Sequence, residues 1–139
     1  MGRRRSLSGK VVFITGGARG IGRATAAALV AKGARVVVGD LDGALATSTA
    51  HELGGGVHAV QLDVTDHVGF TAVLDRIERQ VGPIDVLINN AGVMPIGPFE
   101  DDTHESAFRQ FSINVFALMH GTREAIARMK PRGSGHIVN

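Results

Sequence analysis

A glycine-rich stretch near the amino terminus, TGGARGIG at residues 15–22, has the residue types needed to bind a phosphate group. Gly16 and Gly20 let the backbone approach a ligand closely, and Gly22 lets a following helix pack tightly against a sheet. The N–H groups at the start of that helix, near Ile21, would hold the negative charge of a pyrophosphate. The pattern therefore predicts a dinucleotide-binding turn.

An acidic residue lies where such a turn needs a group that recognises ribose. Asp40 follows Gly16 by 24 residues, at the end of the next β-branched run. A carboxylate there accepts hydrogen bonds from an adenosine ribose and repels a 2′-phosphate. Arg19 argues the other way, since a guanidinium pairs readily with a phosphate. Because repulsion at the ribose outweighs one flexible arginine, the sequence favours NAD over NADP as the cofactor.

Two other interpretations of this stretch are weaker. Gly17 to Gly22, followed by Arg23 and Ala24, nearly matches the P-loop pattern G-x-x-x-x-G-K-[ST] of nucleotide hydrolases. Arginine replaces the lysine, however, and Ala24 has no hydroxyl to ligate magnesium. A plain glycine turn beside a surface carboxylate is the second interpretation, and the context of strand, turn and helix disfavours it.

Alternating strands and helices must position these residues. Short apolar runs predict strands at residues 11–15, 35–39, 57–62, 84–89 and 136–138. Their continuous apolar character is typical of strands covered on both faces. Right-handed crossovers then predict an α/β fold, a Rossmann-type doubly wound parallel sheet of order 3-2-1-4-5 that is incomplete at its carboxyl end. Ligands of such sheets bind at the carboxyl ends of the strands, where the order reverses.

The helices can be placed from their apolar spacing and their caps. Side chains at helical spacing precede the fourth strand: Phe70, Val73, Leu74, Ile77 and Val81. Gly82 and Pro83 then end that helix. Asp42 is the predicted N-cap of the second helix, and Thr103 is the predicted N-cap of a long helix that ends near Lys130.

Five motifs occur in the order and spacing of a known family. They are TGGARGIG (15–22), LDVTD (62–66), NNAG (89–92), INV (113–115) and GHIVN (135–139). With them the chain resembles the amino-terminal half of a short-chain dehydrogenase/reductase, from Leu7 to Asn139 without an evident gap. The resemblance implies a cofactor site made of Thr15, Gly16, Arg19, Gly20, Ile21, Gly22, Asp40, Leu41, Asp63, Val64, Asn90, Ala91 and Gly92.

The resemblance also assigns roles within this set. Asp63 is expected to bond the adenine amino group and the Val64 backbone to contact the ring edge, while residues 89–92 line the cofactor's ribose. The simpler alternative is that these are turn residues at strand ends, since Asn89 and Asn90 are good turn formers. Motif order and spacing favour the functional interpretation.

Asn114 is the one catalytic residue that the resemblance assigns to this chain. An amide between Ile113 and Val115, in an apolar helix, costs free energy unless it is hydrogen-bonded. In the family the equivalent asparagine opens the helix around a water that joins a proton relay. A satisfied core amide is the alternative.

The family transfers a hydride between a nicotinamide and an alcohol or carbonyl substrate. A tyrosine acts as acid or base, a lysine four residues later lowers its pKa, and a serine orients the substrate oxygen. This sequence has no tyrosine and ends at Asn139, before that serine is expected. We therefore expect a truncated chain that is inactive alone; a nucleotide-binding module without catalysis and an inert remnant are the alternatives.

Composition excludes several other classes of protein. Residues 1–8 form a predicted basic extension, with residues 9–139 as the truncated NAD(P)-binding domain. With six Phe, no Tyr, no Trp and a net charge of +2, no nucleic-acid partner is expected, and no apolar run is long enough to predict a membrane partner. Scattered histidines and no cysteine predict no metal site. We expect a cytoplasmic protein, homo-oligomeric in its full-length form by resemblance, and regard the loose myristoylation pattern at residues 1–6 as a chance match.

Overall fold

The computed structural model describes residues 6–139, so the predicted basic extension is described only from Ser6 onward. Five strands form one sheet: β1 (Val11–Thr15), β2 (Arg35–Asp40), β3 (His58–Gln61), β4 (Ile84–Ile88) and β5 (His136–Val138). All pairings are parallel, and the order is β3-β2-β1-β4-β5. The predicted fold class and strand order are confirmed.

Strand ends differ from the predicted ones by at most one residue. β1 and β5 have the predicted bounds, β2 includes Asp40, and β3 and β4 are shorter. Val57 lies outside β3 because its N–H donates to the Gly54 carbonyl in the preceding turn, at 3.1 Å. Asn89 follows β4, yet its N–H still donates to the Val138 carbonyl at 2.9 Å. The ladder between β4 and β5 therefore continues into the NNAG motif.

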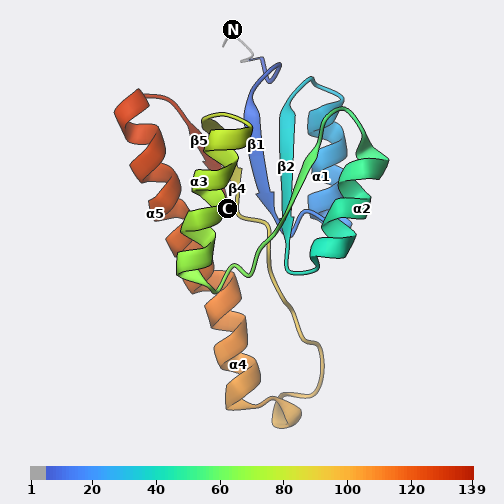
Figure 1. The fold of residues 1–139 in the computed structure, drawn as a ribbon. Helices are drawn as coiled ribbons and strands as arrows, with labels where there is room; N and C mark the ends of the chain where they lie inside the picture. Colours follow the sequence, from blue (N-terminus) through green and yellow to red (C-terminus); the bar gives the residue numbers. More distant parts are fainter. Residues whose placement is uncertain (1–5) are drawn as a thin grey trace, which may run out of the picture.

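Helices cover both faces of the sheet (Figure 1). On one face lie α1 (Gly20–Val30) and α2 (Gly43–Leu53), and on the other lie α3 (His67–Gln80) and α5 (Leu118–Met129). The remaining elements are η1 (Phe99–Asp101), α4 (His104–Phe111), η2 (Ser112–Ala117) and η3 (Lys130–Arg132). In Figure 1, α4 projects beyond the carboxyl edge of the sheet.

Side chains of β1 alternate between two apolar cores. Val11 and Phe13 are buried against the α3 and α5 side, whereas Val12 and Ile14 are buried against the α1 and α2 side. Successive side chains of a strand point to opposite faces of a sheet, so both faces of this strand must be apolar. This is the physical reason for the unbroken run VVFI in the sequence.

The two predicted helix caps are confirmed. Asp42 accepts a hydrogen bond from the Leu45 N–H at 2.9 Å, and the Thr103 hydroxyl accepts one from the Ser106 N–H at 3.1 Å. Asp66 caps α3 in the same manner. Each cap satisfies a backbone donor that has no partner within its helix.

The predicted long helix after Thr103 is present and runs to Met129, with a change of helical type inside it. A π-helical segment, η2, separates α4 from α5 and contains Asn114. A π turn inserts extra residues without ending the helix. Apolar spacing cannot reveal it, because the apolar side chains on either side still recur at nearly helical intervals.

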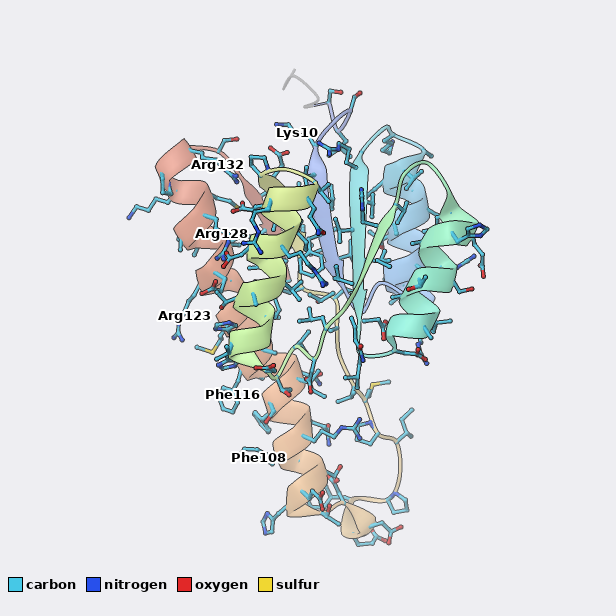
Figure 2. All side chains as sticks on the ribbon, viewed as in Figure 1. Lys10, Phe108, Phe116, Arg123, Arg128 and Arg132 are labelled. Carbon is cyan, nitrogen blue, oxygen red and sulfur yellow. The ribbon has the colours of Figure 1, made fainter. Side chains whose placement is uncertain are left out.

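Arg128 joins α5 to α3 (Figure 2). It donates to the Glu124 carboxylate at 2.6 Å and to the Asp75 carboxylate, and its side chain is 15% exposed. Burial alone would lower the pKa of this guanidinium, but the two carboxylates outweigh burial and raise the pKa above its ordinary value. The two carboxylates therefore favour the charged form of Arg128. Within residues 6–139, no helix has the length and apolar character required to span a bilayer.

Candidate cofactor site

The glycine-rich turn lies at the carboxyl end of β1 and packs against the loop that follows β4. Gly16 has φ +63°, and a Cβ at this position would lie 2.9 Å from the Ala91 Cα. A Cβ on Gly22 would collide with the Gly16 carbonyl oxygen. On the other side of the turn, a Cβ on Gly20 would meet nothing within 4 Å. The turn is therefore tightly packed on its inner side and open on its outer side.

Thr15 and Asn90 hold the backbone of this turn in place. The Thr15 hydroxyl accepts hydrogen bonds from the Asn90 and Ala91 N–H groups, each at 3.1 Å. The Asn90 side-chain amide donates to the Thr15 and Gly16 carbonyls at 3.1 and 3.0 Å. Thr15 is 2% exposed, so these bonds satisfy groups that burial would otherwise penalise.

The N-terminus of α1 differs from those of the other helices near this edge. Its N-cap residue, Arg19, makes no side-chain hydrogen bond to the first turn, whereas α2, α3 and α4 each have a side-chain cap. An N-terminus carries partial positive charge and N–H groups that have no partner within the helix. It can therefore hold an anion.

Asp40 lies beside this N-terminus, at the end of β2, and is half-buried. Its Oδ2 accepts from the Ala18 N–H and its Oδ1 from the Asp42 N–H, both at 3.2 Å. A carboxylate has about four acceptor positions, so two bonds leave capacity for ribose hydroxyls. Arg19 points to the same corner, with Nη2 3.4 Å from Asp42 Oδ2.

Exposed apolar side chains flank the open side of the turn. Ile21 is 79% exposed and Leu41 is 61% exposed, although both follow buried strands closely in sequence. Large apolar residues exposed in this way are typical of surfaces that contact a ligand. An open glycine turn, a helix N-terminus without a side-chain cap and a carboxylate beside it fit a dinucleotide.

The two residues predicted to contact adenine follow β3. Asp63 is exposed, and its Oδ1 accepts from both the N–H and the hydroxyl of Thr65, at 2.9 and 2.7 Å. Val64 is half-buried and packs against the core between the sheet, α3 and α5. Asp63 thus stabilises its own turn with one oxygen, and within residues 6–139 its other oxygen has no protein donor.

Asn114 lies in η2 and bonds to the loop after the NNAG motif. Its Oδ1 accepts from the Val93 N–H at 2.9 Å, and its Nδ2 donates to the Val93 carbonyl at 2.8 Å. The residue is exposed, so its amide is satisfied without lying in a core. The adjacent Gly92 is close enough that a Cβ would lie 3.4 Å from Asn114 Oδ1.

A family model described as short chain dehydrogenase matches residues 10–139. The chain belongs to the short-chain dehydrogenase family.

Similar proteins from bacteria agree with this assignment. Galactitol 2-dehydrogenase of Agrobacterium fabrum is 40% identical over 137 residues, which are 96% of this chain and 52% of the relative. NADP-dependent (R)-specific alcohol dehydrogenase of Lentilactobacillus kefiri is 38% identical over 136 residues, 96% of this chain and 54% of the relative. A solved structure from Novosphingobium aromaticivorans, described as a short-chain dehydrogenase, superposes with a TM-score of 0.90 at 31% identity, over 97% of this chain and 53% of the other. The chain spans about half the length of the relatives it matches.

Sequence reasoning missed part of the structural support for the predicted site in this short-chain dehydrogenase family member. The Asn89 amide donates to the Thr122 hydroxyl at 3.2 Å and to Asn139 Oδ1 at 2.8 Å. A Cβ on Gly121 would lie 2.6 Å from Asn89 Oδ1. Thr122 and Gly121 were not predicted; a glycine inside a helical pattern was the available signal, because it often marks close packing.

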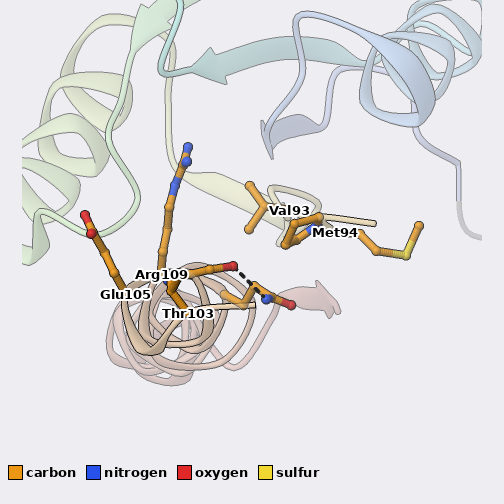
Figure 3. A pocket seen from close by; sticks show the side chains of 8 residues that line it. Val93, Met94, Thr103, Glu105 and Arg109 are labelled. Carbon is orange, nitrogen blue, oxygen red and sulfur yellow. Dashed lines mark hydrogen bonds between the residues drawn. The ribbon is translucent and has the colours of Figure 1, made fainter. Parts of the chain in front are cut away.

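Two hollows lie near the sheet and α4, and no predicted site residue lines either of them. One of about 500 Å³ lies between residues 93–95 and the start of α4. Figure 3 shows Glu105 and Arg109 rising from α4 on one side of it, with Val93 and Met94 on the other. A larger groove of about 1210 Å³ along β4 and β5 contains none of the predicted cofactor residues. Among residues 6–139, no group of three or more acidic or histidine side chains is arranged to hold a metal.

Proposed function

We propose that these residues are the cofactor-binding part of an NAD-dependent oxidoreductase that acts on an alcohol or carbonyl substrate. The observation that carries the proposal is the N-terminus of α1, which has no side-chain cap and lies next to the half-buried Asp40. Relatives such as galactitol 2-dehydrogenase, named for an alcohol oxidation, support the substrate class.

In this proposal each predicted cofactor-binding residue contacts, or supports the contact with, one part of the dinucleotide. Gly16, Gly20 and Gly22 give the pyrophosphate access to backbone N–H groups, with Thr15 and Asn90 fixing the turn beneath it. Arg19, Ile21 and Leu41 lie around the cofactor's adenosine half, Asp63 and Val64 contact adenine, and Ala91 and Gly92 line the ribose. NAD, when bound, supplies the hydride acceptor.

Asp40 supports NAD as the preferred cofactor, because a carboxylate accepts from ribose hydroxyls and repels a 2′-phosphate. The relative from Lentilactobacillus kefiri is named NADP-dependent at 38% identity, so preference can differ between members as similar as this. A few residues near the ribose therefore decide which cofactor is preferred.

Asn114 is the one proposed catalytic residue among these 139 residues, which contain no tyrosine. Its bonds to Val93 hold η2 against the loop that borders the hollow of about 500 Å³, which we propose receives the substrate. We propose that these residues alone transfer no hydride, because the acid or base of the reaction must come from a residue that they do not include.

The proposed partners are the dinucleotide, a small alcohol or carbonyl substrate and a second copy of the full-length protein. Phe108, Phe111 and Phe116 are 71%, 58% and 49% exposed on α4 and η2, which favours burial of this face between copies. The proposed location is the cytoplasm, and a nucleic acid or a membrane is not a proposed partner.

Calorimetry with NADH tests the proposal directly. We expect saturable 1:1 binding to the protein, and at least tenfold weaker binding to Asp40→Ala, because one partner of a charge-assisted hydrogen bond is removed. A panel of secondary alcohols with NAD should give no turnover with these residues alone. Turnover would contradict the tyrosine-dependent chemistry, and absence of NADH binding by the folded protein would contradict the site.

A further inference from the structure

An ion pair lies at the corner of the cofactor site where the ribose is proposed to bind. Arg19 Nη2 is 3.4 Å from Asp42 Oδ2, and both side chains are largely exposed, at 65% and 49%. The other oxygen of Asp42 accepts from the Leu45 N–H at 2.9 Å and caps α2. Asp42 therefore has a structural bond through one oxygen and a charge partner through the other.

The position of Asp42 is itself fixed by Asp40. The Asp42 N–H donates to Asp40 Oδ1 at 3.2 Å, while Asp40 Oδ2 accepts from the Ala18 N–H in the glycine-rich turn. These bonds connect the glycine-rich turn, the end of β2 and Asp42, the N-cap residue of α2. As a result, the Asp42 carboxylate is held within reach of Arg19, which enters from the turn.

Arg19 is the cation of the turn that a 2′-phosphate would require. To bind that phosphate, the guanidinium must leave the Asp42 carboxylate. An exposed pair is worth little, so its loss changes affinity by a modest factor and leaves the fold intact.

We propose that Asp42 is a second determinant of cofactor preference, which holds Arg19 in an ion pair and so keeps it from a 2′-phosphate. The inference rests on the proposed function, since it concerns the same dinucleotide site. Asp42 acts through Arg19 and is a positioning residue.

Asp42→Asn tests this with the cap retained, because asparagine is as good an N-cap as aspartate. The probes are NADH and NADPH, followed by nicotinamide fluorescence at equilibrium, and 5′-AMP and adenosine 2′,5′-bisphosphate, followed by calorimetry. The two members of each pair differ by one phosphate. We expect the variant to bind NADPH and the bisphosphate about three- to tenfold more tightly, with less than about twofold change for NADH and 5′-AMP.

Two further variants separate the mechanism from a general charge effect. Glu100→Gln removes one exposed carboxylate from η1 and should leave all four affinities unchanged. In Arg19→Ala combined with Asp42→Asn, the gain for NADPH should disappear, because the arginine that would contact the phosphate is absent.

An unchanged ratio of NADPH to NADH affinity in Asp42→Asn would overturn the inference, as would a gain that persists in the double variant or appears in Glu100→Gln. If the wild-type protein binds NADH but the ratio does not move, the inference alone fails. If the folded protein binds none of the four probes, the proposed function fails and the inference with it.

Discussion

The glycine-rich turn and the arm formed by residues 93–117 lie at the same carboxyl edge of the sheet, but they are built differently. In the turn, the Thr15 and Gly16 carbonyls are hydrogen-bonded, and a Cβ at Gly16, Gly17 or Gly22 would lie within 3.0 Å of another atom. On the arm, Phe99 and Phe108 are 89% and 71% exposed. Contacts within this chain therefore fix the shape of the turn, whereas these two apolar side chains of the arm are largely exposed to solvent.

The largest expected effect on stability comes from a substitution that disrupts the glycine-rich turn. Gly22→Ala places a Cβ against the Gly16 carbonyl and the Asn90 amide, so we expect a loss of about 2–3 kcal/mol in the free energy of unfolding, together with loss of NADH binding. Gly97→Ala is the matched control in the arm, where a Cβ meets nothing within 4 Å. It should change stability by less than about 1 kcal/mol in urea unfolding. Equal effects of the two changes would contradict the comparison.

A smaller effect comes from one buried hydroxyl of the turn. Thr15→Val keeps the shape of the side chain but removes the acceptor for the Asn90 and Ala91 N–H groups, at an expected cost of about 1–2 kcal/mol. Thr47→Val removes an exposed hydroxyl bond in α2 and should cost less than about 0.5 kcal/mol. Thermal unfolding of both variants measures the difference, and a neutral Thr15→Val would show that the turn does not depend on this contact.

A contact at the opposite edge of the sheet depends on pH. Burial favours a higher pKa for Asp85, but hydrogen bonds from Lys10 Nζ and the Val11 N–H outweigh it and lower that pKa below its usual value. A carboxyl whose folded pKa is lowered stabilises the fold above its unfolded pKa, and this contribution is lost as the pH falls through the folded value. Asp85→Asn should therefore cost about 1 kcal/mol at pH 7 and progressively less below about pH 4. A cost independent of pH, measured by urea unfolding from pH 3 to pH 7, would contradict this.

The smallest expected effect on stability lies in the arm. Phe108→Gln keeps good helix propensity at a side chain that is 71% exposed, so stability should change by less than about 0.5 kcal/mol. On the proposal that copies bury this face, self-association measured by sedimentation velocity should weaken, because one of its exposed apolar side chains is removed. A loss above about 1 kcal/mol would show that Phe108 packs within its own chain.

The sequence predicted the regular parts of this fold from local patterns. Strand positions followed from unbroken apolar runs, and the caps Asp42 and Thr103 followed from residue type, since both signals lie within a few residues. The π turn around Asn114 could not be predicted from apolar spacing, although the family resemblance implied that the helix opens at this asparagine.

The residues that form the site could be predicted from the sequence more readily than the hydrogen bonds and ion pairs between their side chains. The glycine pattern and Asp40 indicated a dinucleotide, but the Asn90 amide bonds to Thr15 and Gly16 join residues about 75 positions apart. The pairing of Arg19 with Asp42 also depends on how closely the turn approaches the start of α2. Such contacts are set by the packed structure and leave no local pattern in the sequence.

The most direct test of the central claim is a ¹H–¹⁵N NMR titration of the protein with NADH. We predict saturable shifts of the amides of Gly16, Ala18, Gly20, Asp63 and Ala91, with those of residues 99–109 nearly unmoved. Absence of shifts from a folded protein, or shifts confined to the groove along β4 and β5, would contradict the claim that the glycine-rich turn binds the dinucleotide.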